Sequence, residues 1–210
     1  NMLLNYFTTP LINIINLQSK IQQAKVANNR LQEVYVVDKE EKGKLKELSF
    51  KQLALKGVSH RFSYQQETLS KIDLTIHKGE KIALMGKSGS GKTTLAKMLS
   101  GYYTKSSGHV TLDKVAIGHA ELRQMVTYVP QQTYVFTGTI LENLLLGFEG
   151  EVDEKELLKV CQQVDILEDI QKMPLGFQTQ VSEDGGLSGG QKQRLAIARA
   201  LLSKQPILIF

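Results

Sequence analysis

Residues 86–93, Gly-Lys-Ser-Gly-Ser-Gly-Lys-Thr, have the types and spacing of a phosphate-binding loop. Glycines let the backbone turn tightly, so that successive N–H groups can point at one anion. Lys92 adds a positive charge for the terminal phosphates, and the Thr93 hydroxyl is a candidate Mg²⁺ ligand. The candidate phosphate-binding residues are Gly86, Lys87, Ser88, Gly89, Ser90, Gly91, Lys92, Thr93 and Thr94.

The flanking residues disfavour the alternative, a glycine-rich surface loop that matches by chance. An apolar run at residues 81–85 predicts a strand that leads into the loop. Residues 94–99 predict a helix behind it, whose positive N-terminal dipole would face the phosphates.

A second glycine-rich turn, Leu-Ser-Gly-Gly-Gln at residues 187–191, precedes a predicted helix over residues 192–201. It too can hold an anion at the exposed N–H groups of a helix start. The alternative is a flexible turn, which its combination with the loop at 86–93 disfavours. Two such helix starts indicate one nucleotide that is held from both sides. The two motifs together resemble the ABC-type ATPases, and residues 187–191 resemble their signature motif.

This resemblance implies ATP and Mg²⁺ as ligands and a second nucleotide-binding domain, in a homodimer, as partner. In that family the phosphate-binding loop of one monomer and the signature motif of the other, arranged head to tail, enclose the same nucleotide. The implied signature residues are Ser188, Gly189, Gly190 and Gln191. Clamping on ATP and release after hydrolysis would then drive the motion.

Other positions match the family one by one. Tyr64 resembles the aromatic residue that stacks on adenine, with Phe62 as the second candidate and a core role as the alternative for both. Gln131 matches the glutamine that closes on Mg²⁺ and links the ATP site to the membrane part; Gln132 is the less favoured claimant, and a polar loop role is the alternative. Glu183 lies in a segment like the acidic-glycine lead-in of exporters, one residue shorter than the usual spacing.

Residues 207–210 predict a short buried strand. In the family such a strand is followed by an Asp that holds Mg²⁺ and by a catalytic Glu, and a switch histidine comes later. The 210 residues include no such pair, and all four histidines precede the signature: His60, His77, His109 and His119. We therefore assign no catalytic residue here beyond an accessory role for Gln131, and expect these residues to bind ATP and to hydrolyse it poorly.

Composition limits the function classes. Hydrophobic residues make up 41% and charged residues 22%, which is ordinary for a folded domain. The net charge of +5 is spread along the chain without an aromatic-basic stripe, so we do not expect a nucleic-acid partner. Cys161 is the single cysteine, which fits a reducing cytosol, and its apolar neighbours indicate a buried structural thiol.

The chain divides into three predicted parts. Residues 1–37 begin with 19 uncharged, largely apolar residues, which indicate the cytoplasmic end of the last membrane helix, and continue as a connecting helix with a period near 3.5. An amphipathic helix that packs on its own domain is the alternative for the second stretch. Residues 38–49 are the linker. Residues 50–210 are the nucleotide-binding domain, cut before the acidic pair.

The predicted fold is α/β: a P-loop NTPase core with an antiparallel β edge, made by residues 53–59 and 69–76. Residues 139–146 and 153–173 are predicted helices, which in this family form a separate helical lobe that carries the signature.

The N-terminal segment, residues 7–35, is similar to bacterial ABC exporters of bacteriocins or competence peptides. These carry an upstream cysteine peptidase that trims a double-glycine leader from the cargo. The resemblance implies a transmembrane domain and a peptide cargo as partners, with the ATPase on the cytoplasmic side of the cell membrane. A lipid or drug exporter, a soluble ABC ATPase and a nucleotide-sensing module without turnover remain open.

Overall fold

A computed structural model describes residues 2–36, 42–63, 67–148 and 153–210, with the backbone alone for residues 2–15. The chain separates into two compact units, Asn1–Glu41 and Lys42–Phe210. Tyr64, the predicted adenine-stacking residue, lies outside the described residues, as do residues 38–41 of the predicted linker.

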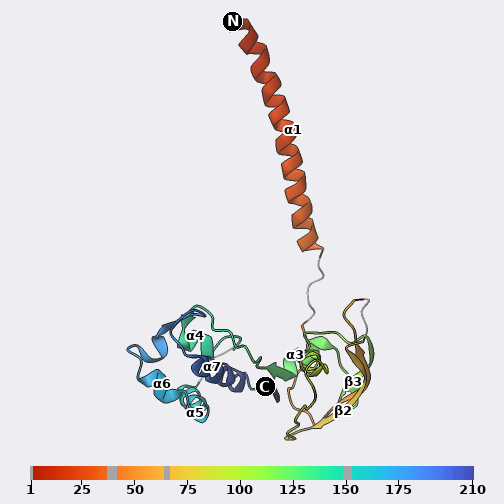
Figure 1. Ribbon diagram of the computed structural model, residues 1–210, viewed down its shortest axis with the longest axis vertical. Coiled ribbons are helices and arrows are strands. Elements are labelled where there is room, and N and C mark those ends of the chain that lie inside the picture. Colours follow the sequence, from red (N-terminus) through yellow and green to blue (C-terminus); the bar gives the residue numbers. More distant parts are fainter. Residues whose placement is uncertain (1, 37–41, 64–66, 149–152) are drawn as a thin grey trace. The chain divides into compact units, whose positions relative to one another are not determined.

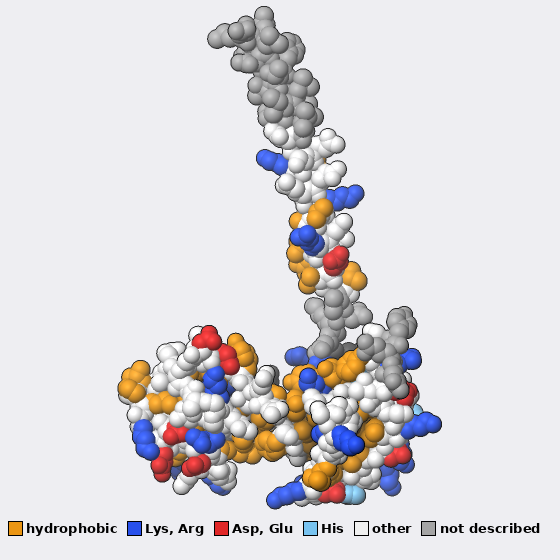
Figure 2. All heavy atoms as spheres, viewed as in Figure 1, with side chains coloured by type: hydrophobic (Ala, Val, Ile, Leu, Met, Phe, Trp, Pro, Cys, Tyr) orange, Lys and Arg blue, Asp and Glu red, His pale blue; other side chains and the backbone are white. Residues whose placement is uncertain are grey.

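The first unit is one continuous helix, α1 (Met2–Tyr35), which confirms the helix predicted for the connecting segment (Figure 1). From Asn16 onward every described side chain of α1 is exposed. Figure 2 shows basic and hydrophobic side chains interspersed along this described part. Among the residues that the structure describes, no helix combines the length and the apolar content of a membrane span.

The second unit begins with an antiparallel sheet of four strands in the order β2-β1-β3-β4. Alternating apolar residues in β1 (Gln52–His60) and β2 (Leu69–His77) produce the predicted pair, with Leu53 opposite Ile76. β3 (Ser107–Leu112) pairs with the other edge of β1 and with the short β4 (Val115–Ala116). The antiparallel edge is therefore confirmed (Figure 1).

Two helices complete this part: α2 (Lys92–Leu99) and α3 (His119–Met125). Both contribute to one hydrophobic core with the inner face of the sheet. Its fully or nearly fully buried members include Leu53, Leu55, Val58, Met98 and Met125. The helix predicted behind the phosphate-binding loop is confirmed as α2, which begins two residues earlier than predicted.

The strand predicted over residues 81–85 is wrong for this structure. The segment is not part of any sheet, and it is exposed along its whole length; Met85 is 91% exposed. The apolar run alone cannot make a strand, because a strand needs a neighbour for its N–H and C=O groups. Within the described residues no strand pairs with this segment.

The remaining elements are mainly helical. They are β5 (Val126–Tyr128), β6 (Gly138–Thr139), α4 (Ile140–Leu144), α5 (Glu154–Gln163), α6 (Leu167–Gln171), a 3₁₀ turn η1 (Gly176–Gln178), β7 (Gln180–Val181), α7 (Gly189–Leu202) and β8 (Ile207–Ile209). Residues 153–173 form two helices instead of one, because Asp165 adopts a left-handed backbone with φ of 59° between them. α4 is shorter than predicted.

A second core joins α4, α5, α6 and α7. Ile140, Ile170 and Leu195 are fully buried there, as is Cys161, which confirms its predicted structural role. β8 pairs in parallel with β5, with Val126 opposite Ile207. The prediction of a buried strand here is only partly right, since β8 is half-buried and Phe210 is 70% exposed.

Candidate functional site

The predicted phosphate-binding loop ends where α2 begins. Gly91 caps the helix in a left-handed conformation, φ 88°. A Cβ atom at Gly91 would lie 2.8 Å from the Leu69 side chain and 3.0 Å from the Thr68 carbonyl oxygen. Both the backbone conformation and the close approach to β2 therefore require glycine at this position.

Lys92 is held by the loop that it closes. Its Nζ atom donates hydrogen bonds of 2.9 Å to the carbonyl oxygens of Gly86 and Lys87. The ammonium group thus lies beside the loop backbone. Its positive charge is therefore held next to the carbonyl oxygens at the start of the loop.

The loop is open to solvent. Residues 86–90 are all exposed, and the space around the Cβ position of Gly89 is open to at least 4 Å. No side chain caps the start of α2, so its first N–H groups are available to an anion. Thr93 is exposed in the first turn of α2, where its hydroxyl is accessible to a metal ion, and Thr94 beside it is half-buried.

The signature segment, residues 187–191, also opens a helix. Ser188 caps α7: its Oγ atom accepts a 3.3 Å hydrogen bond from the N–H of Gln191, and the Gln191 side chain accepts one of 2.9 Å from the N–H of Ser188. Gly189 and Gly190 are exposed, and nothing lies within 4 Å of their Cβ positions. The helix start is capped by this reciprocal pair of bonds, and its two glycines are open to solvent.

Asp169 on α6 connects the signature segment to the helical core. Hydrogen bonds from the side chains of Gln191 and of Arg194 lower the pKa of this carboxyl. The Arg194 guanidinium donates to Asp169 at 2.7 Å. Gln191 is therefore engaged both with the cap of α7 and with α6.

Glu183, the acidic residue of the lead-in, has its partners inside the chain. Its Oε2 atom accepts a 2.9 Å hydrogen bond from the N–H of Val135, and Oε1 lies 3.3 Å from Nζ of Lys192 on α7. The hydrogen bond from Val135, then that from Lys192, lowers the pKa of Glu183. Lys192 also donates to the Glu183 carbonyl oxygen.

The other predicted site residues are less constrained. Gln131 and Gln132 are exposed in a bend after β5. Phe62, the second candidate for adenine, contacts His60 and Tyr103 edge-on, with ring centroids at 4.7 and 5.1 Å. Phe62 is nevertheless 39% exposed, so these contacts do not place it in the hydrophobic core.

In the described residues, no hydrogen bond joins the loop at 86–94 to the signature segment. Each segment lies at the start of its own helix, α2 or α7.

One group of residues was missed by the sequence reasoning. Asn143 on α4 is 1% exposed, and its side chain bonds to the backbone of the loop between β5 and β6. Arg199 on α7 bonds to Asn143 in turn. The signal that could have found them is a polar residue, Asn143, between the apolar Ile140 and Leu144 of a predicted amphipathic helix.

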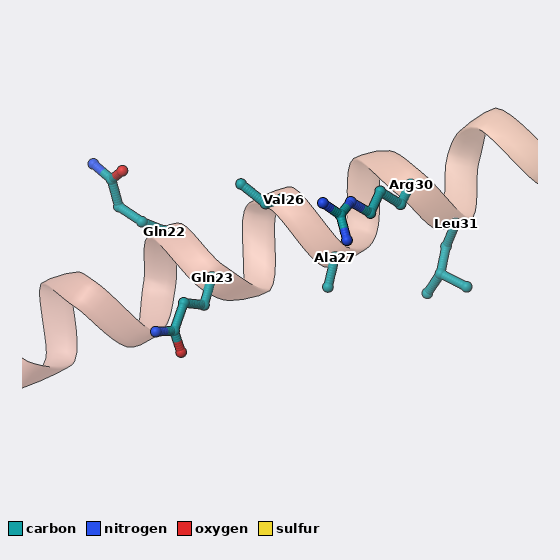
Figure 3. Close-up of a pocket in the computed structure, with 6 residues that line it drawn as sticks. All are labelled: Gln22, Gln23, Val26, Ala27, Arg30 and Leu31. Atoms are coloured by element: carbon teal, nitrogen blue, oxygen red, sulfur yellow. The ribbon is translucent and has the colours of Figure 1, made fainter.

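Two surface hollows do not coincide with these residues. One, of about 520 Å³, follows the exposed surface of α1 beside Val26 and Arg30; Figure 3 shows that the side chains along it point to different sides of a single helix. The other, of about 250 Å³, is lined by α2, β3 and α3, including Met98 and Leu122. The phosphate-binding loop lines neither of these two hollows.

Comparison with known proteins gives three consistent results. The family model described as ABC transporter matches residues 69–210. The chain is 50% identical, over its whole length, to the transport/processing ATP-binding protein ComA of Streptococcus pneumoniae, and 47% identical to the lactococcin-A transport/processing ATP-binding protein LcnC of Lactococcus lactis. It spans 30% of the length of each of these relatives.

More distant matches cover less of the chain or share less sequence. An ATP-dependent lipid A-core flippase of Shewanella oneidensis is 41% identical over 70% of the chain, which spans 26% of that protein. A solved structure of a bacterial Atm1-family ABC exporter with ATP bound superposes with a TM-score of 0.82 at 27% identity, covering 98% of this chain and 37% of that one.

Proposed function

Since this chain belongs to the ABC transporter family, we propose that it is the ATP-driven part of a bacterial membrane exporter whose cargo is a peptide. The two open helix starts, at α2 and α7, would hold the phosphates of ATP from both sides. Residues 50–210 would form the nucleotide-binding domain, and residues 1–37 the connection to a transmembrane domain.

The nucleotide site would form between two copies of the chain. The phosphates would bind the backbone of residues 86–94 and Lys92 of one copy, and Ser188 and the glycines behind it in the other. Thr93, and Gln131 on closure, would hold Mg²⁺, and Tyr64 would stack on adenine. The ion would neutralise charge on the phosphates. Lys92 is already placed by its bonds to Gly86 and Lys87, so little reorganisation is needed on binding.

The 210 residues would supply groups that stabilise charge in phosphoryl transfer, but not the acidic residue that would position the attacking water. No Asp or Glu follows Asp184 in the 210 residues. We therefore propose ATP binding by this chain, with hydrolysis that depends on the acidic pair implied by the family. Cys161 is fully buried and has no part in a proposed peptidase, which would lie upstream.

The observation that carries the peptide cargo is the extent of the matches. ComA and LcnC match the whole chain, including α1 and the linker, whereas the lipid flippase matches 70% of it. The part outside the predicted ATPase motifs thus shares sequence with proteins named for transport and processing. A lipid exporter remains the second candidate because of the 41% identity to the flippase.

The test uses the full-length protein that contains this chain, reconstituted in lipid vesicles with ATP. Uptake of a peptide with a double-glycine leader is compared with uptake of a labelled lipid and of a drug, and Lys92→Ala is the control. ATP-dependent peptide uptake that disappears in the control supports the proposal. Uptake of lipid or drug alone would leave the family assignment standing and exclude the peptide cargo.

A further inference from the structure

The loop between β5 and β6 presents two aromatic side chains to solvent. Tyr134 is 57% and Phe136 is 45% exposed, and their rings meet edge-on with centroids 5.0 Å apart. Val135, between them, is 1% exposed and belongs to the helical core. The loop is therefore fixed by its middle residue, and the aromatic pair stands out on either side of it.

The buried side-chain amide of Asn143 forms hydrogen bonds to the backbone of this loop. The Asn143 Oδ1 atom accepts a 2.9 Å hydrogen bond from the N–H of Phe136, and its Nδ2 atom donates to the Phe136 carbonyl oxygen at 2.8 Å. Nδ2 also donates to the Thr139 carbonyl oxygen at 3.0 Å. With both its donor and its acceptor used, the Asn143 side chain determines where the backbone of Phe136 lies.

Arg199 extends this network to α7. Its Nε atom donates to the Asn143 carbonyl oxygen at 2.8 Å and one terminal nitrogen to Asn143 Oδ1 at 3.2 Å. The guanidinium carbon lies 5.7 Å from the centre of the Phe136 ring, within reach of a cation–π interaction. One side chain of α7 therefore contacts both the buried amide and the exposed aromatic ring.

A second connection runs to the same loop from the start of α7, through Glu183 and Lys192, and ends at Val135. The loop is thus bonded at two neighbouring residues to the helix that opens with the signature segment. Arg199 is half-buried against an amide and a ring, so its contacts are less exposed to water than those of a surface ion pair.

We propose that Arg199 and Asn143 are positioning residues, which make the position of the Tyr134–Phe136 pair depend on the position of the signature helix α7. When nucleotide closes on Ser188, α7 moves and Arg199 carries Asn143 and Phe136 with it. The transfer of this movement to a membrane part, which we call the coupling role, rests on the proposed function. The link between the positions of α7 and the aromatic pair, the positional link, does not.

The positional link is tested on the 210-residue chain. The sequence contains no tryptophan, so Tyr134→Trp provides a single fluorescent reporter. In that background, Arg199→Met is compared with Arg199→Lys and with Arg194→Met, which removes a different guanidinium of α7. Each variant is measured well below its own melting temperature, so that the folded state is observed.

The expected result for Arg199→Met is lower reporter anisotropy and stronger acrylamide quenching than in the Tyr134→Trp protein that keeps Arg199. Arg199→Lys should give anisotropy and quenching between those of Arg199→Met and those of the protein with Arg199 intact. Arg194→Met should leave the reporter unchanged. Equal effects of Arg199→Met and Arg194→Met, or an unmoved reporter in Arg199→Met, would overturn the link.

The coupling role is tested in the full-length protein in vesicles, as the ratio of peptide transported to ATP hydrolysed. Arg199→Met should lower this ratio about fivefold or more, within the usual range of coupling between sites, at an unchanged KM for ATP. A parallel fall in transport and hydrolysis, or an unchanged ratio, would overturn the coupling role. Absence of transport by the unsubstituted protein would instead exclude the peptide-export function and leave the reporter result to decide the link.

Discussion

Lys92 is bonded across the loop to Gly86, the residue at which the loop begins: the ammonium nitrogen lies 2.9 Å from the Gly86 carbonyl oxygen. This bond closes the turn. The side chain that is expected to meet the phosphates is thereby ordered in advance, so less of its conformational entropy is lost on binding.

We predict that Lys92→Ala weakens ATP binding to the chain by more than about tenfold, or about 1.4 kcal/mol. The charge is lost, and so are the two bonds that order the loop. Lys97→Ala is the matched control, because Lys97 lies in the same helix but over the Tyr103 ring, at 5.7 Å. Titration with a fluorescent ATP analogue measures both, and equal losses would contradict a specific role for Lys92.

Gly91→Ala should destabilise the fold more than Gly89→Ala. Both glycines have positive φ, 88° and 81°, so either alanine carries a backbone strain of about 1–2 kcal/mol. Only at Gly91 would the new Cβ also meet Leu69 and the backbone of Thr68, which adds about 1–3 kcal/mol of overpacking. Urea denaturation gives the free energies of unfolding. Indistinguishable values would mean that the approach of β2 to the loop is unimportant.

The motifs and their helices could be predicted from the sequence because they depend on local chemistry. Gly91 and Ser188 are capping residues whose neighbours specify the helix starts. The antiparallel pair of β1 and β2 followed from alternation in each strand. The strand at residues 81–85 was predicted wrongly because a strand also depends on a neighbour that the segment itself does not specify.

The link through Asn143 could not be predicted for a related reason. Its partners, Phe136 and Arg199, are 7 and 56 residues away in the sequence, and the burial of Asn143 only becomes clear when α4 and α7 pack together. A polar residue that acts through a tertiary contact leaves no periodic pattern in the sequence, unlike a residue that acts through its neighbours.

Two substitutions of Ser188 should have different effects, one on the stability of the fold and the other on the assembly of a dimer. Ser188→Ala removes the cap of α7 and is expected to lower the free energy of unfolding by about 1 kcal/mol. Ser188→Arg should leave ATP binding by the monomer intact and prevent an ATP-dependent dimer, because its bulk occupies the surface that would face the second copy.

Thr139→Ala is the control for both variants, since Thr139 caps α4 with the same reciprocal pair of bonds, to Glu142. It should lose similar stability and keep the dimer. Light scattering with and without ATP decides the point. Normal ATP-dependent dimers of Ser188→Arg would exclude the signature segment from the interface.

Cys161 gives the fold a defined dependence on alkaline pH. Burial raises the pKa of its thiol from 9.0 to about 11, so the folded state keeps a proton that the unfolded chain releases. The stabilisation is fully present below pH 9 and is lost as the pH rises towards 11. Its slope approaches about 1.4 kcal/mol per pH unit where the unfolded thiol is ionised and the folded one is not.

Cys161→Ala isolates this contribution from the lysines and tyrosines that titrate in the same range. The variant starts less stable, because it leaves a small cavity among α5, α6 and α7. The difference in free energy of unfolding between the two proteins should shrink from pH 8 to pH 10.5 in urea titrations. A constant difference would show that the thiol ionises as easily in the folded chain as in the unfolded one, and that the core around Cys161 admits water.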